Sequence, residues 1–587
     1  MVSVRSTEAI WAVALLAAGC GPAPRPVASP PPPPATVQPV AIAAPSPAAA
    51  QEQPAELQQA SGQTQSSGQF EVGPSSGRPS RQGHTDPVHV LALGVTLKKK
   101  WQSRVGRTTF RTTMALVGGR VVIGTHGRTL KGKNERDDGV YVLDAKTGKR
   151  VRLIRTPGHG DLDVGGVAID GQSVVFSTDN SQIVKAELGG KVLWKARAKG
   201  KVRPAPALAD LDGDGDLDVV VGDESGMLRA LDGKSGKRLW AVATGGNDYG
   251  AKGFIGAAAV ADLDGDGHPD VVAGARDGIL SAYRGTDGGV LWQIANSSGI
   301  HASPLIADFD QDGHPEVLAA WSYGDVAIAD GRTGEKRWAT RLAEDSGGIE
   351  GLFGTPTPLP GAPGVLIAPT SWWGKEDGIL GVGVDERRFK AFEGRVSASA
   401  VVTDLANDGK PEAILGTEAG ELVALTADGG RALLAKLGGP IEAPAMLADT
   451  DGDGTYELLV ASNDGKLTCF ETGSTKKPFI SRFRGESLHN TGVIGATKLG
   501  WQSQRQGMGA PAASRGGASR GGIRVDYLRC CKALTDQAAR APTPQNKRYL
   551  EAASVCNSLA GLNTDRSKAL ASVRAVLRGA GVPRQCR

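Results

Sequence analysis

Aromatic residues, histidines and long apolar runs are all scarce in this sequence. Aromatic residues make up 5% of the 587 residues and histidine occurs 8 times, whereas glycine occurs 82 times. Beyond the first 20 residues, no stretch is apolar and long enough to span a bilayer, so we predict no transmembrane helix. Few aromatics and abundant glycine are typical of an all-β array with many tight turns. A chain of this length also predicts several domains or a long repeat array.

The first 20 residues carry the pattern of an export signal. A short apolar run, Ala9–Ala18, follows Arg5 and is too short to be a transmembrane helix. The run ends in Ala-Ala-Gly-Cys, which resembles a bacterial lipobox, and the resemblance implies that Cys20 is lipidated and becomes the mature N-terminus. Residues 1–20 are therefore predicted to be a lipoprotein-type signal peptide of an exported, membrane-anchored envelope protein. A secreted or periplasmic soluble protein is the alternative.

Residues 21–89 are rich in proline, alanine and serine and include five consecutive prolines, Pro30–Pro34. Such a segment cannot bury enough apolar surface to fold, so we predict a disordered tether. As a flexible coil it would separate its ends by on the order of 45 Å.

Two sequence markers repeat at the same period. The first is an acidic loop followed by a valine-rich run, as in ALADLDGDGDLDVVVG (Ala207–Gly222). The second is a glycine turn before a tryptophan, as in LRALDGKSGKRLW (Leu228–Trp240), with steps of 46, 52 and 46 residues between the tryptophans. Two markers with one period predict a repeat architecture. The acidic loops begin at Asp210, Asp262, Asp308, Asp404 and Asp449, and the double step of 96 residues leaves one unit, near Thr355, without a loop.

Each unit contains four short strand patterns in roughly 46 residues, which is typical of a propeller blade. We predict an all-β, eight-bladed β-propeller over residues 97–500, with a seven-bladed ring plus an irregular piece as the alternative. Leu97–Val105 is expected to be an outer strand that closes the ring on the last blade. Lys476–Phe483 competes for that place.

The acidic loops fit a calcium clip better than an EF-hand. An EF-hand needs a bidentate glutamate at loop position 12 and a helix on each side. Here position 12 is valine, alanine or leucine, and the loop runs directly into a strand. Carboxylates at positions 1, 3, 5 and 9 crowd hard oxygen ligands around one point, and without a cation their charges would repel each other.

These loops resemble the FG-GAP or VCBS repeats of integrin α-chain propellers, and the tryptophan strands resemble PQQ-like repeats, which also occur in a bacterial outer-membrane assembly lipoprotein. The first resemblance implies structural Ca²⁺ as the cofactor. In the fifth loop Ala406 replaces the second carboxylate, so Asp404, Asp408 and Glu412 are expected to form a weak site. The ligands implied in the four complete loops are Asp210, Asp212, Asp214 and Asp218; Asp262, Asp264, Asp266 and Asp270; Asp308, Asp310, Asp312 and Glu316; and Asp449, Asp451, Asp453 and Glu457.

The PQQ-like repeats also raise an enzyme alternative, a quinone-dependent dehydrogenase, beside an enzyme acting on polysaccharide. Quinone enzymes of this kind resemble one another in a vicinal cysteine disulfide over the cofactor, whereas Cys530 and Cys531 lie outside the repeats. No His-Glu-x-x-His or Cys-x-x-Cys motif is present, and each acidic loop is a separate chelate rather than a carboxylate pair flanking a substrate. We therefore predict no catalytic residues and no enzymatic activity.

A ligand face is expected where glycine-rich links join the blades, because these links carry aromatic and titratable side chains. The alternative is that the same aromatics pack between blades. The candidate residues are Tyr249, Phe254, His301, Glu350, Phe353, Trp372 and Trp373.

The C-terminal part changes character after a Gly/Ser/Arg linker at residues 501–523. Residues 524–587 contain 12 lysines and arginines against 4 aspartates and glutamates, and their apolar residues recur at helical spacing. We predict a small basic α-helical module stapled by two disulfides, because so small a bundle needs covalent support in an exported protein. Cys530 and Cys531 each pair with one of Cys556 and Cys586, in an order that the sequence leaves open.

These features together predict a cell-envelope lipoprotein whose propeller binds a protein or glycan partner. The membrane would be reached through the N-terminal lipid. Export makes nucleic acid an unexpected partner.

Overall fold

The computed structural model describes residues 93–495 except 128–136, 156–161, 245, 247–250, 343–350, 362–363, 371–377, 384–387 and 486, together with Leu534 and Tyr549. The predicted signal peptide with Cys20, the tether and the linker lie outside the described residues. The predicted helical module with Cys530, Cys531, Cys556 and Cys586 also lies outside them, apart from the two single residues.

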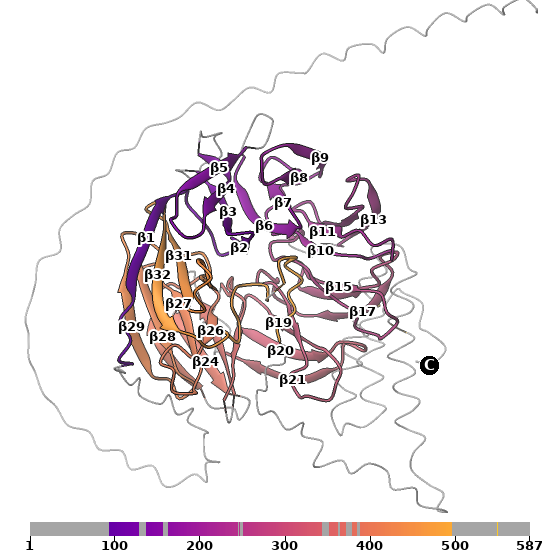
Figure 1. The fold of residues 1–587 in the computed structure, drawn as a ribbon. Coiled ribbons are helices and arrows are strands. Elements are labelled where there is room, and N and C mark those ends of the chain that lie inside the picture. Colours follow the sequence, from indigo (N-terminus) through magenta and orange to yellow (C-terminus); the bar gives the residue numbers. More distant parts are fainter. Residues whose placement is uncertain are drawn as a thin grey trace, which may run out of the picture. The chain divides into compact units, whose positions relative to one another are not determined.

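Eight four-stranded antiparallel sheets are arranged around one axis (Figure 1), which confirms the predicted eight-bladed propeller. Blades 1 to 4 are β2 (Met114–Val117), β3 (Arg120–His126), β4 (Asp138–Asp144) and β5 (Arg150–Ile154); β6 (Val164–Asp170), β7 (Ser173–Thr178), β8 (Gln182–Glu187) and β9 (Val192–Arg197); β10 (Ala207–Ala209), β11 (Asp218–Gly222), β12 (Met227–Leu231) and β13 (Arg238–Ala243); and β14 (Ala259–Ala261), β15 (Asp270–Gly274), β16 (Ile279–Tyr283) and β17 (Val290–Ala295). Blades 5 to 8 are β18 (Leu305–Ala307), β19 (Glu316–Ala320), β20 (Asp325–Asp330) and β21 (Lys336–Arg341); β22 (Thr357–Leu359), β23 (Val365–Thr370), β24 (Gly378–Gly383) and β25 (Arg388–Glu393); β26 (Val401–Thr403), β27 (Glu412–Gly416), β28 (Glu421–Leu425) and β29 (Arg431–Lys436); and β30 (Met446–Ala448), β31 (Tyr456–Ser462), β32 (Lys466–Ser474) and β1 (Lys98–Arg104).

The hydrophobic core lies between neighbouring blades. The second strand β11 is buried along its whole length, whereas in the outer strand β13 only Trp240 is buried. Small aliphatic residues fill the space between blades, and one cluster joins Leu228 and Val220 of blade 3 to Val260 and Val271 of blade 4. Burying each aliphatic side chain of this size stabilises the fold by about 1.5–3 kcal/mol.

The N-terminal strand β1 closes the ring. It pairs antiparallel with β32, with Trp101 opposite Cys469 and Lys98 opposite Glu471. The expected outer strand is therefore confirmed. The competing segment, Lys476–Phe483, does not become an outer strand, because the edge of β32 is already taken.

Tryptophans of four outer strands, Trp101, Trp194, Trp240 and Trp292, join their blade to the next by a hydrogen bond. Trp194 donates its indole N–H to the carbonyl oxygen of Gly233 at 2.9 Å, and Trp101 donates to Ala145 at 2.9 Å across the ring closure. A glycine of the receiving turn lies against the ring: a Cβ at Gly236, where φ is +70°, would stand 2.6 Å from the Trp194 ring. Only glycine fits both the left-handed backbone and the close approach, which explains the Gly-turn and tryptophan marker in physical terms.

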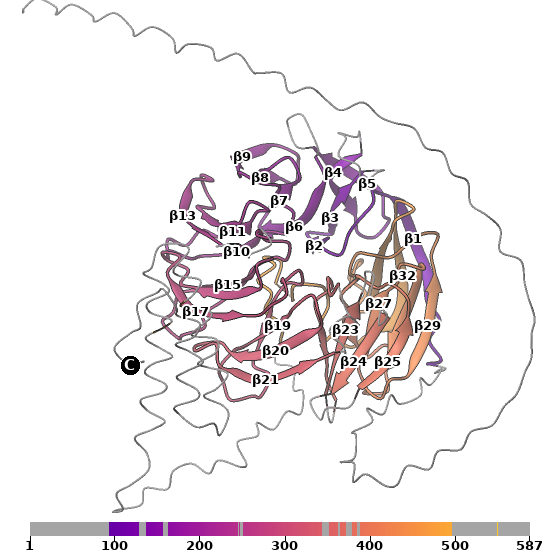
Figure 2. The same cartoon turned by 180° about the vertical axis from the view of Figure 1, so that it is seen from behind.

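The segment after β32 fills the axis of the ring. We name residues 480–485 and 487–494 the axial segment; it is the yellow-orange trace in the middle of the blades in both Figure 1 and Figure 2. Its backbone carbonyls accept hydrogen bonds of 2.7–2.9 Å from the N–H groups of six inner strands. Those donors are Ile169, near the end of β6, and the middle residues of five three-residue strands, Leu208, Val260, Ile306, Val402 and Leu447. The equivalent position in blade 6 is Pro358, which has no N–H to donate.

The axial segment enters and leaves on one face of the ring. Ile480 pairs antiparallel with Val402 and Val493 pairs parallel with Ile306. Inner strands run toward the acidic loops. The segment therefore runs away from the acidic loops where it is antiparallel to an inner strand, and back toward them where it is parallel. We call this side the acidic-loop face, and the opposite side, which carries the links between blades, the linker face. Lys98 at the start of β1 also lies at the acidic-loop face. The strands of a blade alternate in direction, so the first strand ends at this face and the fourth strand, here β1, begins there.

Candidate metal centres and the ring axis

In blade 3, the acidic loop gathers carboxylate oxygens of Asp210, Asp212 and Asp218 within 4.8 Å of one another. Asp210 shapes the loop, since its two oxygens accept the N–H groups of Gly213 at 2.8 Å and Gly215 at 3.0 Å. Asp218 begins β11 and accepts the Leu211 N–H at 3.1 Å. The loop thus turns around its own carboxylates, and both glycines have positive φ, 79° and 88°.

Blades 4 and 5 repeat this arrangement. Their loops bring together Asp262, Asp264 and Asp270, and Asp308, Asp310 and Glu316. In blade 5, Gln311 adopts a φ of 60° where the other two loops have glycine. The fourth predicted ligands, Asp214, Asp266 and Asp312, are not in the close sets; each accepts a backbone N–H two residues further on, at 2.8–2.9 Å.

The electrostatics of the three centres favour a cation. Burial raises the pKa of Asp218 to about 6, and the charges of Asp212 and Asp214 raise it further than burial alone. Burial and neighbouring aspartates likewise raise the pKa of Asp270 to about 6 and of Glu316 to about 7. Carboxylates held so close disfavour their own ionisation, and a divalent ion with oxygen ligands removes that cost. The residues present therefore fit Ca²⁺.

The blade 7 loop, predicted to be weak, gathers no such set among the described residues. Asp404 is buried and holds the N–H groups of Asp408 and Gly409 at 3.0 Å. Glu412 accepts the Leu405 N–H at 2.8 Å, and burial raises its pKa to about 7. Because Ala406 stands in place of a carboxylate, Asp408 and Glu412 are not part of any close set of three carboxylates among the described residues.

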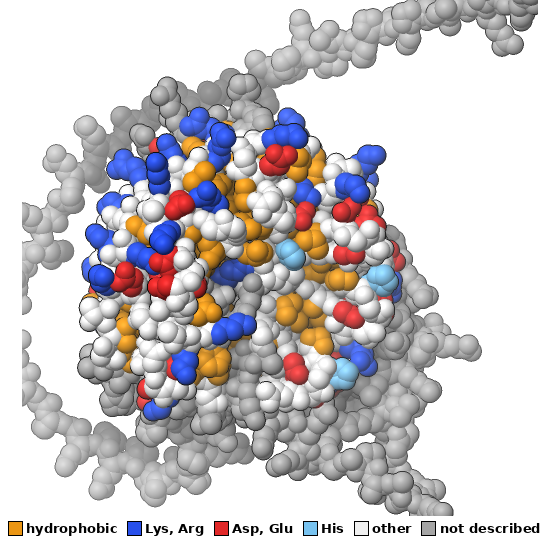
Figure 3. Space-filling model, viewed as in Figure 1, with side chains coloured by type: hydrophobic (Ala, Val, Ile, Leu, Met, Phe, Trp, Pro, Cys, Tyr) orange, Lys and Arg blue, Asp and Glu red, His pale blue; other side chains and the backbone are white. Residues whose placement is uncertain are grey.

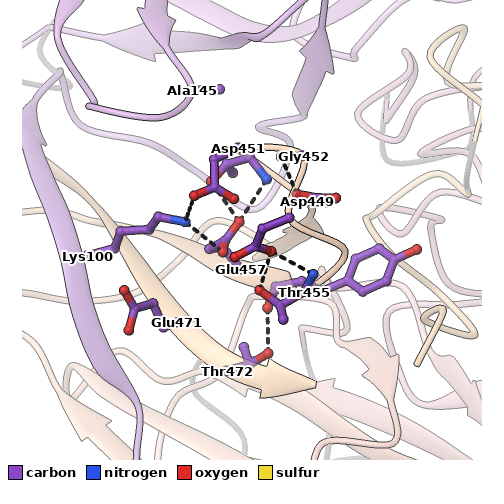
Figure 4. Close-up of polar contacts among 12 residues, drawn as sticks. Lys100, Ala145, Asp449, Asp451, Gly452, Thr455, Glu457, Glu471 and Thr472 are labelled. Atoms are coloured by element: carbon purple, nitrogen blue, oxygen red, sulfur yellow. Dashed lines mark hydrogen bonds and ion pairs between the residues drawn. The ribbon is translucent and has the colours of Figure 1, made fainter. Parts of the chain in front are cut away.

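In blade 8, the ammonium group of a lysine occupies the place of a metal ion. Asp449, Asp451 and Asp453 come within 4.8 Å, but the Lys100 ammonium lies 2.8 Å from Asp451 and 2.9 Å from Glu457 (Figure 4). Burial lowers the pKa of Lys100, yet the hydrogen bonds and charges of the two carboxylates outweigh it and raise the pKa overall. Sequence reasoning missed this contact because Lys100 stands more than 350 positions from its partners.

Replacing Lys100 by leucine is expected to raise the number of bound calcium ions from three to four. Leucine is the matched choice, because the residue before the outer tryptophan is Leu193 in blade 2 and Leu239 in blade 3. Equilibrium dialysis of the wild type and of Lys100→Leu would count the ions. In chelator the variant should melt below the wild type, since Glu457 is 1% exposed and loses its partner. Four ions on the wild type would contradict this assignment.

The predicted ligand-face residues separate into three groups. Phe254 is 2% exposed and packs in the core between blades 3 and 4, so the prediction that it lies on a binding face is wrong. An aromatic in a glycine-rich link gains more from burial than from exposure. His301 and Phe353 do come together, with stacked rings 5.0 Å apart. The remaining residues, Tyr249, Glu350, Trp372 and Trp373, lie outside the described residues.

His301 and Phe353 belong to a cluster at the linker-face mouth of the axis. Phe110 lies 5.3 Å from Phe353, and the Arg111 guanidinium lies 5.1 Å from the Phe110 ring. Burial lowers the pKa of His301 to about 4, so this imidazole is neutral at pH 7. Sequence reasoning missed Phe110 and Arg111, because they precede β2 in a stretch with no repeat signature.

The mouth itself is closed. Phe483 of the axial segment meets Phe110, Phe353 and the links before the inner strands, and the depression they line holds no volume that a water molecule could occupy. Below it, Arg484 and Asn490 are fully buried and donate to backbone carbonyls just before inner strands, with Arg484 bonded to Pro304 at 2.8 Å and Asn490 to Pro206 at 3.3 Å. The axis is thus packed with the protein's own side chains.

In the described part of the chain, no helix has the length and apolar character needed to cross a membrane.

Comparisons with known proteins found one matching family and several similar solved structures. The family of the outer membrane protein assembly factor BamB matches residues 136–351. Among solved structures, BamB from Moraxella catarrhalis is 17% identical, with 64% of this chain and 100% of that chain covered and a TM-score of 0.46. A europium-containing methanol dehydrogenase is 15% identical over 64% and 93% of the two chains, with a TM-score of 0.50. The quinohemoprotein alcohol dehydrogenase from Comamonas testosteroni is 15% identical over 67% and 79%, with a TM-score of 0.47. No curated protein sequence matches the chain.

The chain is therefore an all-β, eight-bladed propeller with PQQ-like repeats. Over residues 136–351 it is similar to BamB, and its resemblance to FG-GAP and VCBS repeats stays a prediction. The europium-containing methanol dehydrogenase shares the fold at 15% identity. The described residues do not fit a quinone on the ring axis, because the axial segment fills it with Arg484, Asn490 and Phe483.

Proposed function

We propose that this protein is a binding scaffold of the bacterial cell envelope, with a calcium-stabilised propeller as its display surface. The signal at residues 1–20, lipidation of Cys20 and the tether at residues 21–89 would hold the propeller at a distance from the membrane. The basic module at residues 524–587, with its two disulfides, would follow the propeller. Neither a catalytic residue nor a redox cofactor is part of this proposal.

One observation supports it above all: the axis where a ring could hold a substrate is packed by the axial segment. A ring whose axis is packed by its own described residues offers its faces and edges, and flat or shallow faces suit macromolecules better than small substrates. The carboxylate sets of blades 3, 4 and 5 support calcium in a structural role. Each set is formed by residues of a single blade, whereas a metal that binds a ligand would lie at a surface that the ligand reaches.

The linker face is the better candidate for the partner. Lys98 and Ile494, near the two ends of the described ring, both lie at the acidic-loop face. The linker face carries Tyr323, which is 44% exposed in the turn between β19 and β20. Exposed aromatic residues are enriched at protein interfaces. An envelope protein is the first expected partner and a glycan the second, and the matching family's name, an assembly factor, supports the first.

Site-specific photo-cross-linking would test this. A photoreactive phenylalanine at Tyr323 is expected to give one discrete adduct in intact cells, because this side chain is exposed on the linker face. The matched control is the same residue at Lys234, whose side chain is 79% exposed on the acidic-loop face. A glycan partner would give an adduct that glycosidases shorten. Adducts from Lys234 alone, or from neither position, would refute the linker face as the binding surface.

A further inference from the structure

A basic cleft lies between the outer strand of blade 8 and blade 1. We name it the β1–β5 cleft; its volume is about 410 Å³. Ser103 joins its two sides, since its hydroxyl donates to the carbonyl of Gly148. The lining residues are Ser103, Arg104, Val105, Asp137, Tyr141, Gly148, Lys149 and Arg150.

Three cationic side chains from separate elements converge on this cleft. Arg104 ends β1, Lys149 lies in the turn after β4, and Arg150 begins β5. Among the described residues, no carboxylate comes within ion-pair distance of any of the three. The Arg150 guanidinium instead lies 6.0 Å from the centre of the Tyr141 ring, which limits its freedom. One carboxylate, Asp137, also lines the cleft, so the lining has a net excess of two positive charges.

The charge around the cleft is also positive. Residues 93–200 contain 21 lysines and arginines against 9 aspartates and glutamates, whereas residues 201–500 contain 27 against 44. Figure 3 shows lysine and arginine side chains gathered over β1, β4 and β5, with fewer of them over β19 to β21. Such a field attracts anions from solution and concentrates them at this side of the ring.

We propose that the β1–β5 cleft binds the phosphate group of a phosphate ester. A phosphate ester presents three acceptor oxygens, which can engage two guanidinium groups and one ammonium at once, whereas a carboxylate presents two. The cleft is larger than a single phosphate and falls within the range of ligand pockets, so an organic group would occupy the rest. Two sources carry this chemistry, a phospholipid headgroup and a soluble phosphorylated compound. This inference is independent of the proposed partner at the linker face.

A different explanation for the same charges has to be separated from this one. Lysines on outer strands also keep exposed sheet edges from pairing with other chains. The repeat supplies a matched control for that role at the junction of blades 2 and 3, two junctions further on. Arg197, Lys237 and Arg238 stand there at the positions of Arg104, Lys149 and Arg150. There, Arg229 replaces Tyr141 and pairs with Asp223 at 2.7 Å.

The test measures binding of two probes to the full chain: soluble sn-glycerol 3-phosphate by calorimetry, and phosphatidylcholine vesicles with and without phosphatidic acid by co-sedimentation. The variant R104Q/K149Q/R150Q is expected to weaken binding roughly tenfold or more, because three charge-assisted contacts are lost. The control R197Q/K237Q/R238Q removes the same charge and should change binding less than about twofold. Melting curves of both variants confirm that these exposed substitutions leave the fold intact.

Loss of binding to both probes in the first variant alone supports the cleft with a soluble source of phosphate. If the protein binds only the phosphatidic acid vesicles, and only the first variant loses this binding, the result supports the cleft as a phosphate site with a lipid headgroup as its ligand. Equal losses in the two variants would mean diffuse attraction to a basic surface and would overturn the proposal. Absence of binding to either probe would overturn it as well.

Discussion

A chain that ends after Ser474 is expected to be unfolded or molten at 25 °C, whereas a chain that ends after Gly495 should melt cooperatively. The shorter chain lacks the axial segment, so six inner strands lose the carbonyls that accept their N–H groups. Each such hydrogen bond contributes about 0.5–1.5 kcal/mol net, and an unpaired buried N–H costs more. The summed loss is on the order of 5 kcal/mol or more, within the range of the total stability of a folded domain.

Loss of Ile480 and Ile494 adds to this effect. Both are 3% exposed and pack into the cluster formed by blades 5, 6 and 7. Near-ultraviolet circular dichroism and calorimetry would compare the two truncated chains. A synthetic peptide of residues 475–495 should restore the signal of the shorter chain, since the axis would be open to it. A shorter chain that melts like the longer one would show that the axial segment is dispensable.

Point substitutions separate the role of the axial segment from a general effect of truncation. Arg484 is fully buried and donates to Pro304 and Ala258, so Arg484→Met should cost roughly 3 kcal/mol by leaving these carbonyls unpaired. The matched control is Phe479→Ala, one residue before the same segment and 43% exposed, which should stay within about 0.5 kcal/mol of the wild type. Equal effects of the two substitutions would contradict a structural role for the Arg484 hydrogen bonds.

The parts of this fold that sequence could predict are those encoded in one repeat. An acidic loop, the strand after it and the tryptophan of the outer strand interact within one blade or with the next, so their spacing recurs and can be counted. The axial segment interacts with a different blade at nearly every residue. Its partners, from Ile169 to Leu447, are separated from it by between 34 and 319 positions, and no periodicity marks them.

The candidate sites follow the same division. The close carboxylate sets of blades 3, 4 and 5 were predictable because their ligands lie within nine residues of chain. Lys100 was not, since its place beside Asp451 depends on the register of ring closure, which the sequence alone does not fix. Phe254 was misplaced because a glycine-rich link predicts a surface position, whereas packing between blades decides where its aromatic ring lies.

Removal of calcium is expected to produce the second large loss of stability. A ligand at 100 times its dissociation constant, bound only to the folded state, stabilises it by about 2.7 kcal/mol per site. Three sites in blades 3, 4 and 5 would therefore contribute about 8 kcal/mol if they are independent. Scanning calorimetry in calcium and in chelator should show a fall in the melting temperature on the order of 10 °C.

The direction in which a control variant changes the melting temperature distinguishes calcium binding from an effect of acidic charge alone. Asp212→Asn/Asp264→Asn/Asp310→Asn removes one ligand from each site. It also relieves part of the charge repulsion that adds to burial in raising the pKa of Asp218. In chelator this variant should melt at or above the wild type, and in calcium it should melt below it. Magnesium should stabilise the wild type less than calcium, because it demands a smaller octahedral shell. A melting temperature that chelator leaves unchanged would contradict the metal assignment, and the repulsion among these carboxylates would then be a cost that the packed blades alone sustain.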